Sequence, residues 1–144
     1  MAKVVERSAL VPFSAAQMFE LVNDIERYPE FMDGVVGTQL VSRSESEIVA
    51  GLDIRKSGFA QSFITRNTLI PFERIEMQLV EGPFEQLEGT WTFEALGDIG
   101  CKVGLILTFE FKSKILAVAG NRVLESVGNQ LVDAMSQRAN KRYS

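Results

Sequence analysis

Histidine is absent from the sequence, and its absence removes the commonest general base and the commonest metal ligand of proteins. The sequence has one cysteine, Cys101, so neither an intrachain disulfide nor a cysteine-rich zinc site can form. Without a histidine partner, this thiol also cannot form the Cys–His pair of a nucleophilic enzyme. No glycine-rich phosphate-binding loop of standard spacing is present. We therefore expect no metal, no cofactor and no catalytic residue of these classes.

Carboxylates are the acid–base groups that remain. Asp24 and Glu26 lie close together in the chain, as do Glu81 and Glu85. Two carboxylates serve as general acid and general base where their environments separate their pKa values. Nothing in the sequence places either pair in a pocket, so a small carboxylate-dependent hydrolase or cyclase is the weakest of the functional hypotheses.

Long apolar segments are missing as well. A membrane-spanning helix needs about 18 apolar residues, and the longest helix-like apolar run is the much shorter segment from Ile115 to Gly120. The first seven residues acquire charge at once, so we expect no secretory leader. Together with the single cysteine, these features predict a soluble cytoplasmic protein.

The composition instead fits one folded domain. The chain has 144 residues, of which 46% are hydrophobic and 24% are charged. A chain of this size hides roughly 70% of the surface that its unfolded form exposes, which is sufficient for a hydrophobic core. No repeat, low-complexity tract or linker interrupts the sequence, and we expect a single domain over residues 1–144.

Charge is unevenly distributed along the chain. Residues 1–111 carry 9 basic and 17 acidic side chains, whereas residues 112–144 carry 6 basic and 2 acidic ones. The net charge of −4 argues against DNA binding through phosphate neutralisation. Arg138, Lys141 and Arg142 lie three and four positions apart, so they share one face of a helix. That face is either a solvated surface favoured by the helix dipole or a contact for an anionic partner.

The N-terminal part of the chain predicts a strand followed by two short helices. Residues 3–11 are typical of a strand. Ser14 and Gln17 form a capping-box pattern, which begins a helix that reaches about Val22. A second short helical turn is expected over residues 24–29, where a proline restricts the residue before it.

The middle of the chain alternates apolar and polar residues with a period of two, which is typical of half-buried strands. Tight turns separate these strands, so we expect an antiparallel meander. From Lys114 a helical period returns for about twenty-five residues, enough to cross the sheet at 1.5 Å per residue. The predicted fold is α+β, with a curved sheet of about seven strands around a long C-terminal helix. The strand segments of the meander are residues 35–54 with a break at 42–46, 59–70, 75–80, 87–95 and 101–111.

The predicted inner face of the sheet and the helix mixes large and small side chains. A curved sheet and a helix do not touch everywhere, so a cavity that suits an apolar ligand is one interpretation of the small residues. Equally, glycines allow a helix to approach a sheet closely. The large residues are Phe63, Met77, Leu79, Trp91, Phe93 and Phe109, and the small ones are Ala50, Gly89, Ala119, Gly120 and Gly128.

Three polar residues, Gln61, Thr65 and Asn67, share a predicted strand face with Phe59 and Phe63. If that face is the inner one, these residues are the few polar groups that orient a ligand. If it is the outer one, they are ordinary surface residues. The register of this strand is ambiguous, so both interpretations stay open.

Several short motifs follow the pattern of a known family. Through these motifs, which are given at the end of this paragraph, the whole chain resembles the START-like, helix-grip superfamily of the polyketide cyclase/dehydrase type. Within it, the chain is similar to the branch that contains the ribosome-association toxin RatA and the mitochondrial coenzyme Q-binding proteins. Met135 is a departure, because the family usually has phenylalanine there. The motifs are Tyr28-Pro29-Glu30-Phe31, Gly82-Pro83-Phe84 followed by Leu87, Gly89, Trp91 and Phe93, and Arg138-Ala139 with Tyr143.

The resemblance implies an antiparallel sheet that grips a long helix around an apolar tunnel. It implies two functions. The first is non-catalytic binding of ubiquinone or a similar isoprenoid lipid in support of respiration. The second is association with the large ribosomal subunit, which blocks subunit joining. The enzyme activities of the superfamily are not carried over, because a fold alone does not determine function and the expected catalytic groups are missing.

The preferred hypothesis is a non-enzymatic carrier that takes a quinone-like hydrophobic molecule into the tunnel. Each buried CH₂ group contributes about 0.8 kcal/mol, so a few isoprene units suffice for useful affinity. Tyr28 and Phe31 are expected to gate the mouth of the tunnel. Its predicted lining is Phe63, Met77, Trp91, Val123 and Val127.

The alternative hypothesis is a RatA-like regulator that binds the large ribosomal subunit through Arg138, Lys141 and Arg142. A ligand and a ribosome would use different surfaces, so the two hypotheses do not exclude each other. Transient peripheral contact with the inner membrane is left open for a carrier, and no DNA partner is expected.

Overall fold

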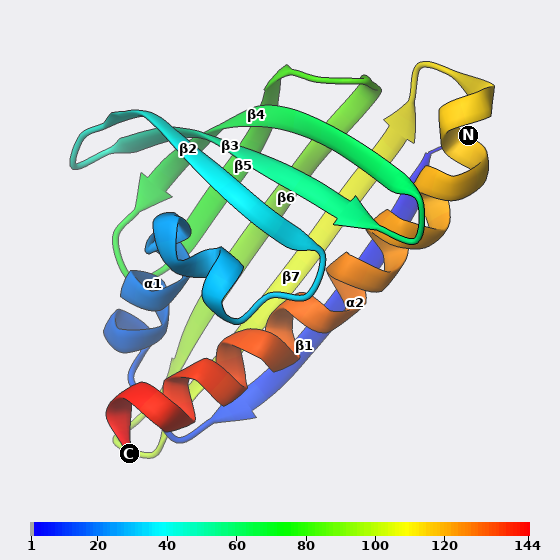
Figure 1. The fold of residues 1–144 in the computed structure, drawn as a ribbon. Helices are drawn as coiled ribbons and strands as arrows, with labels where there is room; N and C mark the ends of the chain where they lie inside the picture. Colours follow the sequence, from blue (N-terminus) through cyan, green and yellow to red (C-terminus); the bar gives the residue numbers. More distant parts are fainter. Residues whose placement is uncertain (1) are drawn as a thin grey trace.

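The computed structural model describes residues 2–144. Seven strands form one antiparallel sheet in the order β1-β7-β6-β5-β4-β3-β2, and this curved sheet wraps around the long helix α2 (Figure 1). The predicted α+β architecture is therefore confirmed. The elements are β1 (Lys3–Val11), α1 (Ala15–Asn23), the 3-10 helix η1 (Ile25–Glu30), β2 (Val35–Arg43), β3 (Glu47–Lys56), β4 (Phe59–Ile70), β5 (Arg74–Glu81), β6 (Phe84–Leu96), β7 (Gly100–Phe111) and α2 (Lys114–Tyr143).

Helix α1 begins with the capping box that the sequence predicts. Ser14 Oγ accepts a hydrogen bond from the backbone N–H of Gln17 (3.1 Å), and Gln17 Oε1 accepts one from the backbone N–H of Ser14 (3.0 Å). Together they satisfy backbone donors that have no partner inside the helix. After α1 ends, the hydroxyl of Tyr28 donates to the carbonyl of Val22, which fixes η1 against the end of α1.

Two elements are longer than their sequence patterns predict. Strand β6 begins at Phe84 instead of Leu87, because Phe84 pairs with Phe111 ahead of an irregularity in the register. Helix α2 has 30 residues. Its last turns continue the apolar stripe through Met135 and Ala139, which are fully buried. Polar contacts add to this packing, such as the bond from the Tyr143 hydroxyl to the backbone carbonyl of Gln17. Within residues 2–144, no helix is both long and apolar enough to cross a membrane.

The hydrophobic interior consists of two clusters that lie under different parts of α2. The first half of α2 packs through Val123 and Val127 on a cluster rich in phenylalanine, which includes Phe84 and Phe109. The second half packs on a cluster that α1 and η1 also join, with Trp91 among its members. The candidate site lies within the second cluster.

Two of the three small residues predicted on the inner face of α2 are buried against the sheet, whereas the third, Ala119, is exposed. A Cβ atom on Gly120 would lie 2.6 Å from Phe111 Cζ, and a Cβ atom on Gly128 would lie 3.2 Å from Val5 Cγ1. A Cβ atom is essentially never found 2.6 Å from another side-chain atom, so at Gly120 the ring of Phe111 occupies the space that a side chain would need. At both positions the missing side chain allows close approach of helix and sheet, and it leaves no cavity.

Candidate functional site

A pocket of about 70 Å³ lies between the sheet and the second half of α2, and we call it the inner pocket. Strands β3 to β6 form its floor, while α1, η1 and one residue of α2 close it from the other side. The lining is mainly apolar, as is usual for small-molecule sites. The lining residues are Val22, Asn23, Ile25, Tyr28, Ala50, Leu52, Thr65, Asn67, Ile75, Met77, Trp91 and Leu131.

A polar pair from β4 lies in the wall of the inner pocket. Asn67 is only 5% exposed, and Thr65 Oγ1 donates to Asn67 Oδ1 at 2.9 Å. Because residues two apart on a strand share a face, this bond fixes the orientation of the amide. It leaves the amide NH₂ group of Asn67 as a donor for an acceptor atom of a ligand.

The placement of this pair resolves the ambiguous register of β4. Thr65 and Asn67 line the inner pocket, so they belong to the inner face of the sheet. Gln61 instead lines a surface hollow that also includes Asp53 and Gly82. Of the three polar residues singled out in the sequence, two are therefore candidates for orienting a ligand.

Trp91 and Met77 contribute an aromatic ring and a thioether to the mainly apolar lining of the inner pocket. Trp91 is buried and stacks on Phe93 with 6.5 Å between ring centroids. Met77, from the neighbouring strand, adds a flexible thioether that adapts to the shape of a ligand.

Burial and, to a lesser degree, the charge of Asp24 raise the pKa of Tyr28 far above its ordinary value. The hydroxyl of Tyr28 therefore stays protonated at neutral pH and serves as a structural donor.

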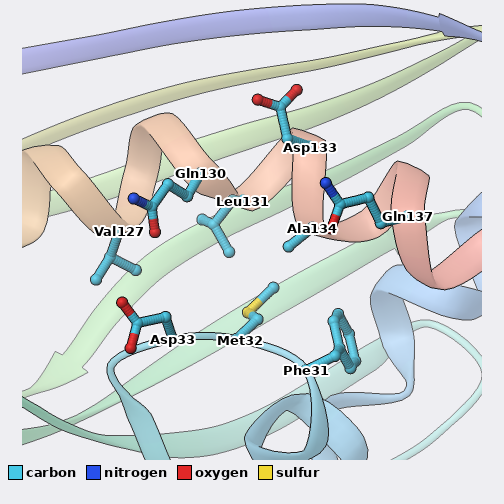
Figure 2. Close-up of a pocket in the computed structure, with 9 residues that line it drawn as sticks. All are labelled: Phe31, Met32, Asp33, Val127, Gln130, Leu131, Asp133, Ala134 and Gln137. Carbon is cyan, nitrogen blue, oxygen red and sulfur yellow. The ribbon is translucent and has the colours of Figure 1, made fainter.

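An open groove of about 320 Å³ lies beside the inner pocket, between α2 and the segment that follows η1 (Figure 2). We call it the outer groove. Leu131 lines both spaces, so it stands between them. The lining mixes apolar and polar groups. Phe31, Met32 and Asp33 form one side of the outer groove, and residues of α2 form the other (Figure 2). The lining residues are Phe31, Met32, Asp33, Val127, Gln130, Leu131, Asp133, Ala134 and Gln137.

Arg138 holds one end of the outer groove together. Its Nη2 atom donates to Glu30 Oε1 at 2.7 Å, and its guanidinium carbon lies 5.0 Å from the ring centroid of Phe31. The hydrogen bond from Arg138, aided by the charges of Arg138 and Arg27, holds the pKa of Glu30 below its ordinary value. Arg138 therefore joins α2 to the segment that carries Phe31.

The three cations predicted to bind a partner differ in their surroundings. Arg138 is engaged with Glu30, and Arg142 Nη1 lies 3.3 Å from Asp24 Oδ2. Lys141 is exposed and has no ion-pair partner among residues 2–144. Two of the three side chains thus have a structural role at the junction of α2 and η1, and Lys141 is the one left free.

The predicted ligand-binding residues fall into three groups. Tyr28, Met77 and Trp91 meet at the inner pocket, and Phe31 and Val127 line the outer groove. Val123 and Phe63 belong to the phenylalanine-rich cluster and line neither space. Phe63 packs edge-on against Phe84, with 5.4 Å between ring centroids.

Sequence reasoning missed Leu131 and Ile75 as lining residues. Leu131 belongs to the apolar stripe of the C-terminal helix, so the periodicity marks it as buried but not as a divider between two spaces. Ile75 lies at the start of a strand, where its burial depends on the curvature of the sheet. Neither residue carries a chemical feature that distinguishes a pocket wall from an ordinary core position.

The carboxylates lie outside the inner pocket. Among the described residues that line it, none is an aspartate or a glutamate. Asp33 and Asp133 line the outer groove, where they pair with Lys56 (2.8 Å) and Arg7 (3.6 Å). Within residues 2–144 no cluster of three or more acidic or cysteine side chains is arranged to hold a metal ion.

Comparison with protein families and curated proteins gives a consistent result. A family model described as "Polyketide cyclase / dehydrase and lipid transport" matches residues 11–136. The ribosome association toxin RatA of Vibrio cholerae is 45% identical over 141 residues, which cover 98% of each chain. The mitochondrial coenzyme Q-binding protein of Drosophila melanogaster is 25% identical over 140 residues, which cover 94% of this chain and 58% of that protein.

Comparison with solved structures supports the same fold. The Zhui aromatase/cyclase from a Streptomyces species superposes with a TM-score of 0.88 at 16% identity, over 100% of this chain and 97% of that one. At this level of identity the likeness concerns the fold alone, since one fold hosts many functions.

Proposed function

We propose that this chain, which belongs to the polyketide cyclase / dehydrase and lipid transport family, is a ribosome-associating regulator. Within that family it belongs to the branch of RatA and coenzyme Q-binding proteins. Its partner in this proposal is the large ribosomal subunit, and its effect is to block subunit joining. The observation that carries the proposal is the 45% identity, over nearly the full length of both chains, to a relative named for ribosome association. Of the two functions that the sequence suggests, this one therefore ranks first.

The C-terminal turn of α2 is the contact that we propose for the ribosome. Ribosomal RNA presents phosphates, which attract unpaired cations. Lys141 is exposed and unpaired within residues 2–144, whereas Arg138 and Arg142 are neutralised by Glu30 and Asp24. Lys141 is therefore the residue of this turn whose charge is available to a partner.

Gradient centrifugation with purified subunits tests this proposal. We expect the protein to migrate with the large subunit and not with the small one. Binding should weaken as salt rises, because contacts to phosphate release counterions. Migration with neither subunit at low salt would contradict the proposal.

The inner pocket supports a second function, which is the binding of a compact apolar molecule that carries a hydrogen-bond acceptor. A quinone ring has both properties, since its carbonyl oxygens accept hydrogen bonds and its faces are apolar. In this proposal the amide NH₂ group of Asn67 donates to one carbonyl, and Trp91 and Met77 contact the ring. In this proposal the protein binds the quinone and catalyses no reaction on it.

The dimensions of the two spaces shape this second proposal. Sites for drug-sized ligands usually measure roughly 300–1,000 Å³, so the inner pocket of about 70 Å³ is too small for a quinone with its tail. The outer groove measures about 320 Å³. We infer that the ring occupies the inner pocket and that the isoprenoid tail runs past Leu131 into the outer groove, which requires Leu131 to change its side-chain rotamer.

Fluorescence of Trp91 tests ligand binding directly, because the chain has one tryptophan and it lines the inner pocket. Titration with a short-chain ubiquinone should quench this fluorescence and reach saturation. An isoprenoid alcohol of equal tail length is the control, and it should bind more weakly because it lacks the ring carbonyls. Absence of saturable quenching, together with absence of extractable lipid in the purified protein, would exclude this second function without affecting the first.

A further inference from the structure

We propose that the N-terminal end of α2 is a docking surface for an anionic lipid bilayer. Ile115 and Val118 are 85% and 82% exposed, and their spacing of three places them on one side of the helix. Lys112, Lys114 and Arg122 surround them in the chain, and all three are exposed. We call these five residues the α2 tip. It lies at the opposite end of α2 from Lys141, so the inference does not depend on ribosome association.

The cations of the α2 tip have no ion-pair partner among residues 2–144, and the acidic residues of the same helix are already engaged. Glu125 pairs with Lys3 of β1 at 3.8 Å, and Asp133 pairs with Arg7 of β1 at 3.6 Å. The α2 tip thus presents three cations without an ion pair among the described residues, although Glu125 lines a surface hollow together with Lys114 and Arg122 and the chain as a whole has a net charge of −4. An anionic partner is the complement of such a surface.

The position of two of these lysines also argues for an external partner. The N-terminus of a helix favours acidic side chains and disfavours cations, yet the first turn of α2 contains no acidic residue. Ser113 already caps the helix, because its Oγ atom accepts from the backbone N–H groups of Ile115 (3.2 Å) and Leu116 (3.3 Å). Lys112 and Lys114 lie on either side of this cap, where the helix dipole disfavours their positive charge.

A bilayer matches both chemical parts of the α2 tip. Anionic headgroups attract lysine and arginine, and the interface of the bilayer accepts aliphatic side chains. A nucleic acid would use the cations but would leave Ile115 and Val118 in water. The apolar part consists of two side chains, so we expect peripheral and reversible contact.

Co-sedimentation of the full chain with lipid vesicles tests the proposal. We expect binding to vesicles that mix phosphatidylglycerol with phosphatidylcholine, and little binding to vesicles of phosphatidylcholine alone. Raising the salt to about 0.5 M should release the protein, because screening then shortens the reach of surface charge to a few ångströms. A protein that ignores the anionic vesicles at low salt would overturn the proposal.

Paired variants separate the two contributions. Ile115→Ser with Val118→Ser removes the aliphatic part, and Lys112→Gln with Lys114→Gln removes two charges. Each pair should lower the affinity for anionic vesicles by roughly tenfold or more. All four positions are exposed, so the fold should persist, and circular dichroism checks this.

Matched controls lie elsewhere on the surface. Ile99, which is 82% exposed in the turn between β6 and β7, is replaced by serine. Lys102 of β7, another cation without an ion-pair partner among residues 2–144, is replaced by glutamine. Both controls should bind vesicles like the unaltered protein. If the controls lose as much affinity for anionic vesicles as the α2-tip variants, the proposal is wrong. It is also wrong if the α2-tip variants keep vesicle binding and lose ribosome binding, a result that would assign this surface to RNA.

Discussion

Arg138 Nη2 lies 2.7 Å from Glu30 Oε1, and this bond ties the C-terminal part of α2 to the end of η1. The same guanidinium group covers the ring of Phe31, which lines the outer groove. Glu30 and Phe31 both precede the loop that leads to β2. Through these two contacts, Arg138 sets the position of the side of the outer groove that faces α2. The ion pair is partly exposed, and such pairs contribute little to global stability. Its main effect is therefore on the local geometry of the groove.

The bond between Arg138 and Glu30 should appear in the pH dependence of stability. Its hydrogen bond lowers the pKa of Glu30 from the ordinary value of 4.5. A carboxyl group with a lowered pKa in the folded state stabilises the protein above its unfolded pKa, and this contribution is lost as the pH falls through the folded pKa. Because the pair contributes little to global stability, we expect Glu30→Gln to lower Tm only slightly at neutral pH, with a difference that shrinks below about pH 4.5.

Thermal melts of both proteins from neutral to acidic pH measure this effect. Glu45→Gln is the control, because Glu45 lies in an exposed turn and has no ion-pair partner among residues 2–144. A Tm difference for Glu30→Gln that does not change with pH would contradict the account of this bond.

Close packing of α2 on the sheet predicts different costs for alanine at its two buried glycines. At Gly120 a Cβ atom would lie 2.6 Å from Phe111 Cζ, so Gly120→Ala should lower the free energy of unfolding by about 1–3 kcal/mol through overpacking. At Gly128 the nearest atom lies 3.2 Å away, and the better helix propensity of alanine offsets a small shift of Val5. Gly128→Ala should therefore be nearly neutral. Denaturant unfolding measures both, and equal effects would contradict the packing described for the first half of α2.

The fold could be predicted from the sequence because its local and global patterns agree. The capping box at Ser14, the period of two in the strands and the long apolar stripe of α2 each predict an element that the structure contains. The exact length of α2 could not be predicted, since Ala139 is followed mostly by polar residues. The polar contacts of the last turns are with Glu30, Asp24 and Gln17, which are distant in sequence.

The candidate site was less predictable, because a cavity depends on how two surfaces fit. Periodicity assigns Phe63 and Trp91 to the inner face equally well, yet Phe63 packs against Phe84 and Trp91 faces the inner pocket. Likewise, the sequence shows Arg138 and Lys141 on one helix face, but it does not show that Glu30 neutralises only the first. These distinctions arise from tertiary contacts.

Asn67 should determine the affinity of the inner pocket for a quinone ring. Asn67→Leu keeps a similar volume and removes the donor, so the Kd for a short-chain ubiquinone should rise roughly three- to tenfold, the effect of removing one hydrogen bond. Quenching of Trp91 fluorescence measures it. Gln61→Leu is the matched control on the same strand, outside the inner pocket, and should bind normally. Similar Kd values for the two variants would show that Asn67 does not contact the ligand.

Lys141 should contribute to ribosome binding through its charge. Lys141→Glu should weaken migration with the large subunit and lower the salt dependence of binding, by about one unit of the log–log slope for each phosphate that the variant no longer neutralises. Lys102→Glu changes the charge by the same amount on β7 and should bind like the unaltered protein. Arg138→Glu does not serve this purpose, because it would place two carboxylates together at Glu30. Equal binding of the two lysine variants would remove the C-terminal turn from the proposed contact.

The central proposal, that this protein blocks ribosomal subunit joining, is tested most directly by the assembly of whole ribosomes from isolated subunits. Light scattering follows this assembly as purified protein is added in increasing amounts. We expect assembly to fall in proportion to the large subunits that are occupied, and to recover when Lys141→Glu replaces the unaltered protein. Normal assembly with every large subunit occupied would contradict the proposal.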